Sequence, residues 1–240
     1  MCSFGHTKLV TKCPKGGVII AVFDRFAAQR EQLSEVLLSR QLSPDGQRSA
    51  FCHLRRLENR EFFEKLEQKR LCPSCFDLGA EASALFCAAR EVSPFPPGAL
   101  RLFPFDRPLP VVADRELFRA VFLNLCCNSF LYGGRHPFLE LSLFGANAKA
   151  VLVLRDFGPG LCKTVQLPPH GGLNLARSFA LDAEGMFLFS SAPCKGVCCA
   201  LSLPLRKSGV LLPPPSGSTL LQDTFSPVFV QLAPLCIFPE

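Results

Sequence analysis

The chain has 240 residues, of which 48% are hydrophobic and 19% are charged. This composition excludes a disordered protein, and the length is sufficient for one sizeable α/β domain with a smaller appendage. The longest early apolar run, residues 18–23, falls far short of the roughly 18 apolar residues that a membrane-spanning helix needs, and no small-residue cleavage site follows it. We therefore expect a cytoplasmic protein with no membrane span and no signal peptide.

Basic residues are scattered along the chain rather than gathered in one region. Lys and Arg number 26 against 20 Asp and Glu, which gives a formal net charge of +6. Between residues 55 and 70, basic residues alternate with Glu, a pattern typical of the solvated face of a helix. A nucleic-acid-binding protein more often has a concentrated basic surface with exposed aromatic residues, so we expect no nucleic-acid partner.

The 13 cysteines are numerous, but their placement does not predict a disulfide framework. Two adjacent pairs, 126–127 and 198–199, lie inside apolar segments, where free cysteine behaves as a small core residue. The one spacing typical of metal ligands is Cys72-x-x-Cys75, which supplies two of the four ligands that zinc prefers. A turn between helices is the simpler interpretation of this motif, and metal binding by Cys72 and Cys75 stays open.

An N-terminal segment, residues 1–16, precedes a unit at 17–75 that the pattern predicts to be an antiparallel helical hairpin. Apolar residues recur at three-, four- and seven-residue steps on both sides of a strong turn signal at 42–46. A hairpin cannot bury its apolar stripe alone, so it must pack on a second copy of itself or on the rest of the chain. A homodimer through a four-helix bundle is the expected solution.

Residues 76–206 alternate helix and strand patterns and predict an α+β fold. Helices are expected at 77–91, from Asp114 onward, and at 173–181. Strands are expected at 99–105, 109–112, 138–144, 150–155, 186–190 and 197–203. The antiparallel-looking strands late in the domain favour an α/β sandwich, a mixed sheet covered by helices on one face, over a doubly wound sheet.

Residues 207–240 predict a Pro-rich linker followed by an apolar tail. Consecutive prolines begin at Pro213, and the apolar stretch between 225 and 238 is itself interrupted by prolines. Such a tail can dock on the domain as an edge strand or bind a partner, and the sequence does not distinguish these alternatives.

Residues 124–129 (NLCCNS) resemble the N box, NLxxNA, of the ATPase domain of sensor histidine kinases, which belongs to the GHKL superfamily. Asn124 and Asn128 stand at i and i+4 of the expected helix, so both amides project from one face. The resemblance implies that both asparagines contact the nucleotide. It also implies that Asn128 binds Mg²⁺, because an amide oxygen suits a hard cation held partly by phosphates.

Residues 156–160 (DFGPG) follow an expected strand and resemble the DxGxG box of the same family. The resemblance implies that the Asp156 carboxylate accepts a hydrogen bond from the adenine amino group. It also implies that Gly158 and Gly160 let the backbone approach the nucleotide, because glycine carries no side chain.

Residues 171–176 (GGLNLA) resemble the GxGLGLA box, which opens a helix in the family. In that role, Gly171, Gly172 and Leu173 would present backbone N–H groups to phosphate oxygens.

Segments 185–187 and 194–205 resemble the closing strands of the domain, including their final Leu-Pro-Leu. The boxes occur in the family's order and together imply that residues 76–206 form an ATPase domain that binds ATP with Mg²⁺. The predicted hairpin then occupies the place of the helices that form a dimer and carry the phosphorylated histidine in the family.

The chain departs from the family at the phosphoacceptor. In the family, this histidine lies in the first helix of the hairpin and an acid follows it, whereas residues 18–42 contain no histidine. His53, in the expected second helix, is the candidate catalytic residue, but Leu54 follows it in place of the acid that would act as general base. A surface or interface histidine is the simpler interpretation of His53.

The chain also departs from the family in the basic residues around the phosphates. Leu131 stands where the N box usually has a Lys or His, and Asn174 replaces a glycine. Lys163, His170 or Arg177 would have to supply the positive charge. Because phosphoryl transfer depends on electrostatic stabilisation, these changes affect turnover more than adenine binding.

Two functions from different classes follow. The first is an ATP-binding, histidine-kinase-like signal transduction protein of a two-component system, which phosphorylates its own His53 or a partner protein, with weak or lost autokinase activity. A response regulator or another protein is the expected partner. The alternative is a catalytically degenerate dimeric adaptor or phosphotransfer scaffold that acts through protein–protein contacts.

Overall fold

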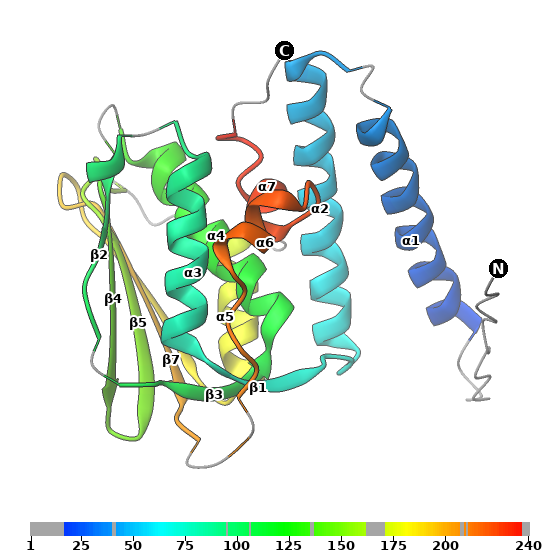
Figure 1. Ribbon diagram of the computed structural model, residues 1–240. Coiled ribbons are helices and arrows are strands. Elements are labelled where there is room, and N and C mark those ends of the chain that lie inside the picture. The colour runs from blue at the N-terminus through cyan, green and yellow to red at the C-terminus, as the bar shows by residue number, and fades with distance from the viewer. Residues whose placement is uncertain are drawn as a thin grey trace.

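The computed structural model describes residues 17–39, 42–94, 96–105, 107–134, 137–161, 171–206, 209 and 211–236 (Figure 1). The expected N-terminal segment, 1–16, lies outside these residues. None of the described helices combines the length and the apolar character that crossing a membrane requires.

The elements follow the chain in three groups. The hairpin consists of α1 (Gly17–Leu38) and α2 (Pro44–Glu67). The domain after it contains β1 (Pro73–Asp77), α3 (Leu78–Val92), the 3₁₀ helix η1 (Pro97–Ala99), β2 (Leu100–Leu102), β3 (Pro110–Asp114), α4 (Arg115–Tyr132), β4 (Leu139–Ala146), β5 (Lys149–Asp156), α5 (Gly172–Asp182), β6 (Met186–Ser191) and β7 (Val197–Pro204). The C-terminal segment contains α6 (Gly217–Gln222) and α7 (Pro227–Gln231).

A five-stranded mixed sheet with the order β2-β4-β5-β7-β6 forms one layer of the domain. β2 runs parallel to β4, and the other neighbouring strands are antiparallel. Helices α3, α4 and α5 cover one face of this sheet (Figure 1). The predicted α+β fold, a mixed sheet covered by helices on one face, is therefore confirmed.

The core lies between the sheet and these helices. In β4, Leu139, Leu141 and Leu143 point into it and are buried, whereas Phe144 on the opposite face is exposed. Helix α4 is buried on nearly all sides, because the sheet covers one side and α5 and α7 cover others. This central position makes α4 the element through which distant parts of the chain meet.

Two aspartates cap α3 and α4, as their sequence positions predicted. Asp77 caps α3 by accepting hydrogen bonds from the backbone N–H groups of Gly79 and Ala80. Asp114 caps α4 by accepting from the backbone N–H of Leu117.

The Cys72-x-x-Cys75 motif does not form a turn between helices. Residues from Pro73 onward form β1, which pairs antiparallel with β3 so that Cys75 lies opposite Val112. The backbone N–H of Cys72 donates to Asp114, which fixes the entry of this strand. Within the described ranges, no group of three or more His, Cys, Asp or Glu side chains is placed to hold a metal ion.

Several apolar residues of the hairpin pack on the rest of the chain. Phe63 of α2 belongs to the main core, and Phe51 and Leu54 form a smaller cluster with Val230 and Ala233 of the C-terminal segment. Leu33 and Leu37 of α1 pack on this smaller cluster from outside. The structure thus shows packing of the hairpin on the rest of the chain, and the homodimer stays a prediction.

The C-terminal segment docks mainly as helices and not as an edge strand. Leu212 forms a single parallel bridge with Phe76 of β1, and the chain then continues into α6 against α3 and α7 between α2 and α4 (Figure 1). Val228, Gln231 and Leu232 are completely buried in this position. The segment therefore joins the hairpin to the domain.

Candidate functional site

Asn124 lies in the middle of α4, is 1% exposed, and is bonded to other parts of the chain. Its side-chain Nδ2 lies within hydrogen-bond distance of the Gln231 Oε1 at 2.8 Å and of the Asn59 Oδ1 at 3.1 Å. Its Oδ1 accepts from the Arg55 Nε at 3.1 Å. The Asn124 amide is thus hydrogen-bonded to side chains of α2 and α7. Contact between Asn124 and a nucleotide stays a prediction, and it requires these hydrogen bonds to be replaced by bonds to the nucleotide.

Asn128 lies one turn further along α4 and is half-buried. Its side chain makes no hydrogen bond with any residue that the structure describes, in contrast to Asn124. Its amide oxygen is therefore free of described protein partners, as a metal ligand would have to be.

Asp156 ends β5 and is 5% exposed. Its Oδ1 accepts from the backbone N–H of Gly158 at 3.1 Å and from that of Val197 at 2.9 Å. These bonds join the loop after β5 to the start of β7. The second oxygen, Oδ2, accepts no hydrogen bond from the described residues, so one oxygen holds the loop and the other is available to a ligand.

The glycines after Asp156 are required by contacts within the protein. A Cβ at Gly158 would lie 2.7 Å from the Gly133 Cα at the end of α4, which no side chain allows. Gly160 has φ of +65° and would direct a Cβ onto the carbonyl oxygen of Ala192. The loop is therefore held close to α4 and to the β6–β7 connection, which places Asp156 beside the C-terminal half of α4.

Helix α5 begins against α4. Gly171 is its N-cap and supplies no side-chain hydrogen bond, so the first N–H groups of the helix, including those of Gly172 and Leu173, have no side-chain cap. A Cβ at Gly172 would lie 3.3 Å from the Asn124 Oδ1, which shows how closely the two helices approach. The structure thus brings together α4, the start of α5 and the loop after Asp156.

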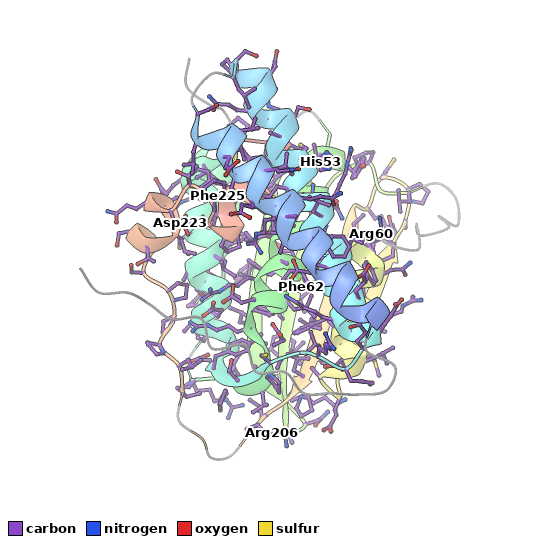
Figure 2. The ribbon with its side chains drawn as sticks, turned by 90° about the vertical axis from the view of Figure 1, so that its right-hand side faces the viewer. His53, Arg60, Phe62, Arg206, Asp223 and Phe225 are labelled. Carbon is purple, nitrogen blue, oxygen red and sulfur yellow. The ribbon has the colours of Figure 1, made fainter. Side chains whose placement is uncertain are left out.

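Other predicted residues lie outside this group or outside the described chain. His53 is exposed on α2, and in the view of Figure 2 it lies to the opposite side of the hairpin from Phe225. Lys163 and His170 fall in 162–170, which is not among the described residues. Leu131 and Arg177 are both exposed. Catalysis by His53 stays a prediction.

Sequence reasoning missed two residues that contact α4, Arg55 and Gln231. The Arg55 guanidinium reaches Asn124 and also lies 3.4 Å from the Cys127 Sγ. Gln231 is completely buried and donates through Nε2 to the Glu58 Oε2 at 3.1 Å. No periodicity signals either contact, because each joins segments that are distant in sequence.

Burial governs the titration of two groups in this region. Burial raises the pKa of Glu58, while the Arg30 guanidinium and the hydrogen bond from Gln231 act in the opposite direction. Burial also raises the pKa of the Cys127 thiol, and Arg55 beside it only partly offsets this effect. Cys127 is therefore a neutral thiol at neutral pH.

No protein-family model and no curated protein matches the sequence. Among solved structures, the Acinetobacter baumannii histidine kinase AdeS matches with a TM-score of 0.50 at 17% identity, covering 77% of this chain and 98% of the AdeS chain. The chain has the fold of a histidine kinase. The AdeS match covers a larger share of the chain than residues 76–206 alone would supply, so it extends beyond the predicted ATPase domain.

Two further histidine kinases match over a smaller part of the chain. The catalytic domain of ThkA gives a TM-score of 0.48 at 18% identity and covers 56% of this chain and 99% of that chain. A mycobacterial sensor histidine kinase, MprB, gives a TM-score of 0.45 at 18% identity, again with 56% of this chain and 99% of that chain covered.

Proposed function

We propose that the chain is an ATP-binding, histidine-kinase-like signal transduction protein, in which the nucleotide binds between α4, α5 and the loop after β5. The observation that carries this proposal is the buried Asp156 carboxylate, whose Oδ1 holds the loop while its Oδ2 has no described partner. A carboxylate oxygen without a described protein partner can accept a hydrogen bond from a ligand, and the adenine amino group would donate one here. The histidine-kinase fold supports the same location.

The residues at the other end of this site fit a nucleotide phosphate with Mg²⁺. Asn128 offers an amide oxygen without a described protein partner, and Mg²⁺ prefers few protein ligands together with phosphate oxygens. The start of α5, with Gly171 and Gly172, offers backbone N–H groups without a side-chain cap. Bound Mg²⁺ would neutralise charge on the phosphate oxygens.

Calorimetry with Mg²⁺-ATP tests the proposal on the wild type and on Asp156→Asn. Asparagine retains the Oδ1 that accepts from Gly158 and Val197, so the loop should stay folded, but it places an N–H₂ group where Oδ2 would accept from adenine. We expect saturable binding by the wild type, loss of binding in Asp156→Asn, and no change in Asp45→Asn, whose side chain is 92% exposed.

Two results would contradict this assignment. A folded wild-type protein that binds no ATP at millimolar concentration would exclude nucleotide binding as the function. Equal ATP affinity in Asp156→Asn and the wild type would place the nucleotide elsewhere.

Weak or lost autokinase activity is part of the proposal, and it separates the enzyme from a degenerate adaptor. The first helix contains no described histidine, and the exposed His53 contacts none of the site residues by a hydrogen bond that the structure describes. Incubation with ATP labelled at the γ-phosphate tests transfer, since phosphohistidine is labile in acid. Acid-labile label that disappears in His53→Gln would identify His53 as acceptor, whereas ATP binding without any label, on the protein or on a partner, would favour the adaptor or phosphotransfer scaffold.

A homodimer through the hairpin, a response regulator or another protein as partner, and a cytoplasmic location belong to the same proposal. Helix α1 leaves Val36 and Leu38 exposed, at 45% and 64% of their surfaces, and these two side chains are the ones through which the dimer is tested. Light scattering after size-exclusion chromatography should show a dimer for the wild type and a monomer for Val36→Lys/Leu38→Lys. A monomeric wild type would contradict the dimer.

A further inference from the structure

Arg55 is a cation from the hairpin that reaches the helix carrying Asn128. Its Nε donates to the Asn124 Oδ1 at 3.1 Å, its Nη2 donates to the same oxygen, and its Nη1 lies 3.4 Å from the Cys127 Sγ. The side chain is half-buried between α2 and α4. All of its described contacts are therefore with α4, across a separation of about 70 residues.

Within the described part of the chain, Arg55 has no acidic partner. Its hydrogen-bond neighbours are the Asn124 amide oxygen and the Cys127 sulfur, neither of which belongs to an acidic residue. Two other half-buried arginines, Arg115 and Arg119, differ because both bind the Glu81 carboxylate. A guanidinium withdrawn from water without an anion is unfavourable, and an anionic ligand would compensate it.

The position of Arg55 coincides with the phosphate end of the proposed site. The Asn124 Oδ1 that binds Arg55 also lies 3.3 Å from the Cβ position of Gly172, at the start of α5. Asn128 lies one turn after Asn124 on the same face of α4. Asn124 therefore links the guanidinium to the start of α5, and Asn128 follows it along this face.

We propose that Arg55 binds the β- and γ-phosphate oxygens of the nucleotide, in place of the basic residue that α4 lacks at Leu131. This inference rests on the proposed nucleotide site. A guanidinium forms bidentate hydrogen bonds with phosphate, stronger than those it makes with a neutral amide, so phosphate would displace Asn124 as its partner. Because Arg55 belongs to α2, binding of a nucleotide di- or triphosphate ties the hairpin to the domain, whereas adenosine monophosphate does not.

Calorimetry with ATP and with AMP tests Arg55 directly, and the adjacent Arg56 provides a matched control. Arg56 is exposed, and Arg56→Gln removes the same charge from the same turn of α2. We expect Arg55→Gln to weaken ATP binding by about ten- to a hundredfold, the effect of one lost hydrogen-bonded charge pair, and to leave AMP binding unchanged. Arg56→Gln should change both affinities by less than about twofold, since exposed charges contribute little.

Arg55→Lys keeps the charge and loses the bidentate geometry, so its ATP affinity should lie between those of the wild type and Arg55→Gln. It also replaces Arg55→Gln if that variant does not fold. Equal ATP affinity in the wild type and the Arg55 variants would overturn the inference while leaving the proposed function intact. An equal loss of ATP and AMP binding in Arg55→Gln would also overturn it, because Arg55 would then only support the fold of the site.

Tripolyphosphate separates failure of this inference from failure of the proposed function. It lacks adenine, so the wild type and Asp156→Asn should bind it alike, and Arg55→Gln should bind it at least about tenfold more weakly. A wild type that binds ATP but shows no difference from Arg55→Gln for tripolyphosphate would refute the role of Arg55. A wild type that binds neither ATP nor AMP would refute the nucleotide site itself.

Discussion

Gln231 is the residue through which the C-terminal segment holds both the hairpin and α4. It is completely buried, accepts from the Asn124 Nδ2 at 2.8 Å, and donates to the Glu58 Oε2 at 3.1 Å. Gln231→Leu keeps a side chain of similar size and removes both bonds. It therefore isolates the polar part of the contact between α7, α2 and α4.

The two bonds differ in strength because one involves a charged group. The bond between the Gln231 and Asn124 amides should contribute about 1 kcal/mol to the free energy of unfolding, and the bond to the Glu58 carboxylate about 1.5–3 kcal/mol. Asn124 retains the Ala120 carbonyl at 2.9 Å as an acceptor, and Glu58 retains Arg30 at 3.1 Å, so neither is left without a partner. We therefore expect Gln231→Leu to lower the free energy of unfolding by about 2.5–4 kcal/mol, before the apolar gain of leucine.

Urea denaturation followed by circular dichroism measures this change, with Gln222→Leu as the matched control. Gln222 ends the neighbouring short helix α6 and is exposed, so its replacement should change stability by less than about 0.5 kcal/mol. Hydrogen exchange should also become faster in α2 and α7 of Gln231→Leu. A free energy of unfolding within about 0.5 kcal/mol of the wild type would refute the reasoning.

Three further changes test other parts of the structure. Glu81→Ala leaves Arg115 and Arg119 without the buried carboxylate that binds both, and should lower the free energy of unfolding in urea by about 3–5 kcal/mol. A decrease below about 1 kcal/mol would contradict this expectation. The pKa of Glu58 is raised in the folded protein, so the folded state binds more protons than the unfolded state, and stability falls as the pH rises above about 4.5. Glu58→Gln should flatten this dependence in a series of melting curves recorded at different pH values. An unchanged slope would contradict this role of Glu58. In Gly160→Ala, the new Cβ would sit on a backbone of positive φ and overlap the Ala192 carbonyl. This variant should have a lower melting temperature and weaker ATP binding in calorimetry. Unchanged values of both would show that the loop adapts.

The parts of the fold that follow from local chemistry were predictable. Asp77 and Asp114 precede apolar runs with the 3.6-residue period, and both cap helices in the structure. The late strands are short, largely apolar runs, and their predicted antiparallel pairing was correct. These signals act over a few neighbouring residues, which is why the sequence carries them.

Other features depend on surfaces that form only after folding. The apolar tail after Ser226 has no period because prolines interrupt it, and its helical form depends on the surfaces of α2 and α4 that it covers. Arg55 belongs to a run of alternating charges that resembles a solvated face, and only α4 distinguishes it from Arg56. For Asn124, the i, i+4 spacing to Asn128 identified the face of α4 but not the segments that cover it.

The residues that resemble the histidine-kinase boxes are not equally informative about function. Gly158 and Gly160 are required by close contacts within the protein, so the fold alone explains them. The Oδ1 of Asp156 is likewise explained by its bonds to the backbone, and an asparagine would make the same bonds. The fold does not explain why the other carboxylate atom of Asp156, Oδ2, is a hydrogen-bond acceptor. It also does not explain why the half-buried Arg55 has no acidic partner among the described residues. These two unexplained groups, the Oδ2 of Asp156 and the guanidinium of Arg55, are the ones that adenine and phosphate would satisfy, and they support nucleotide binding more strongly than the glycines.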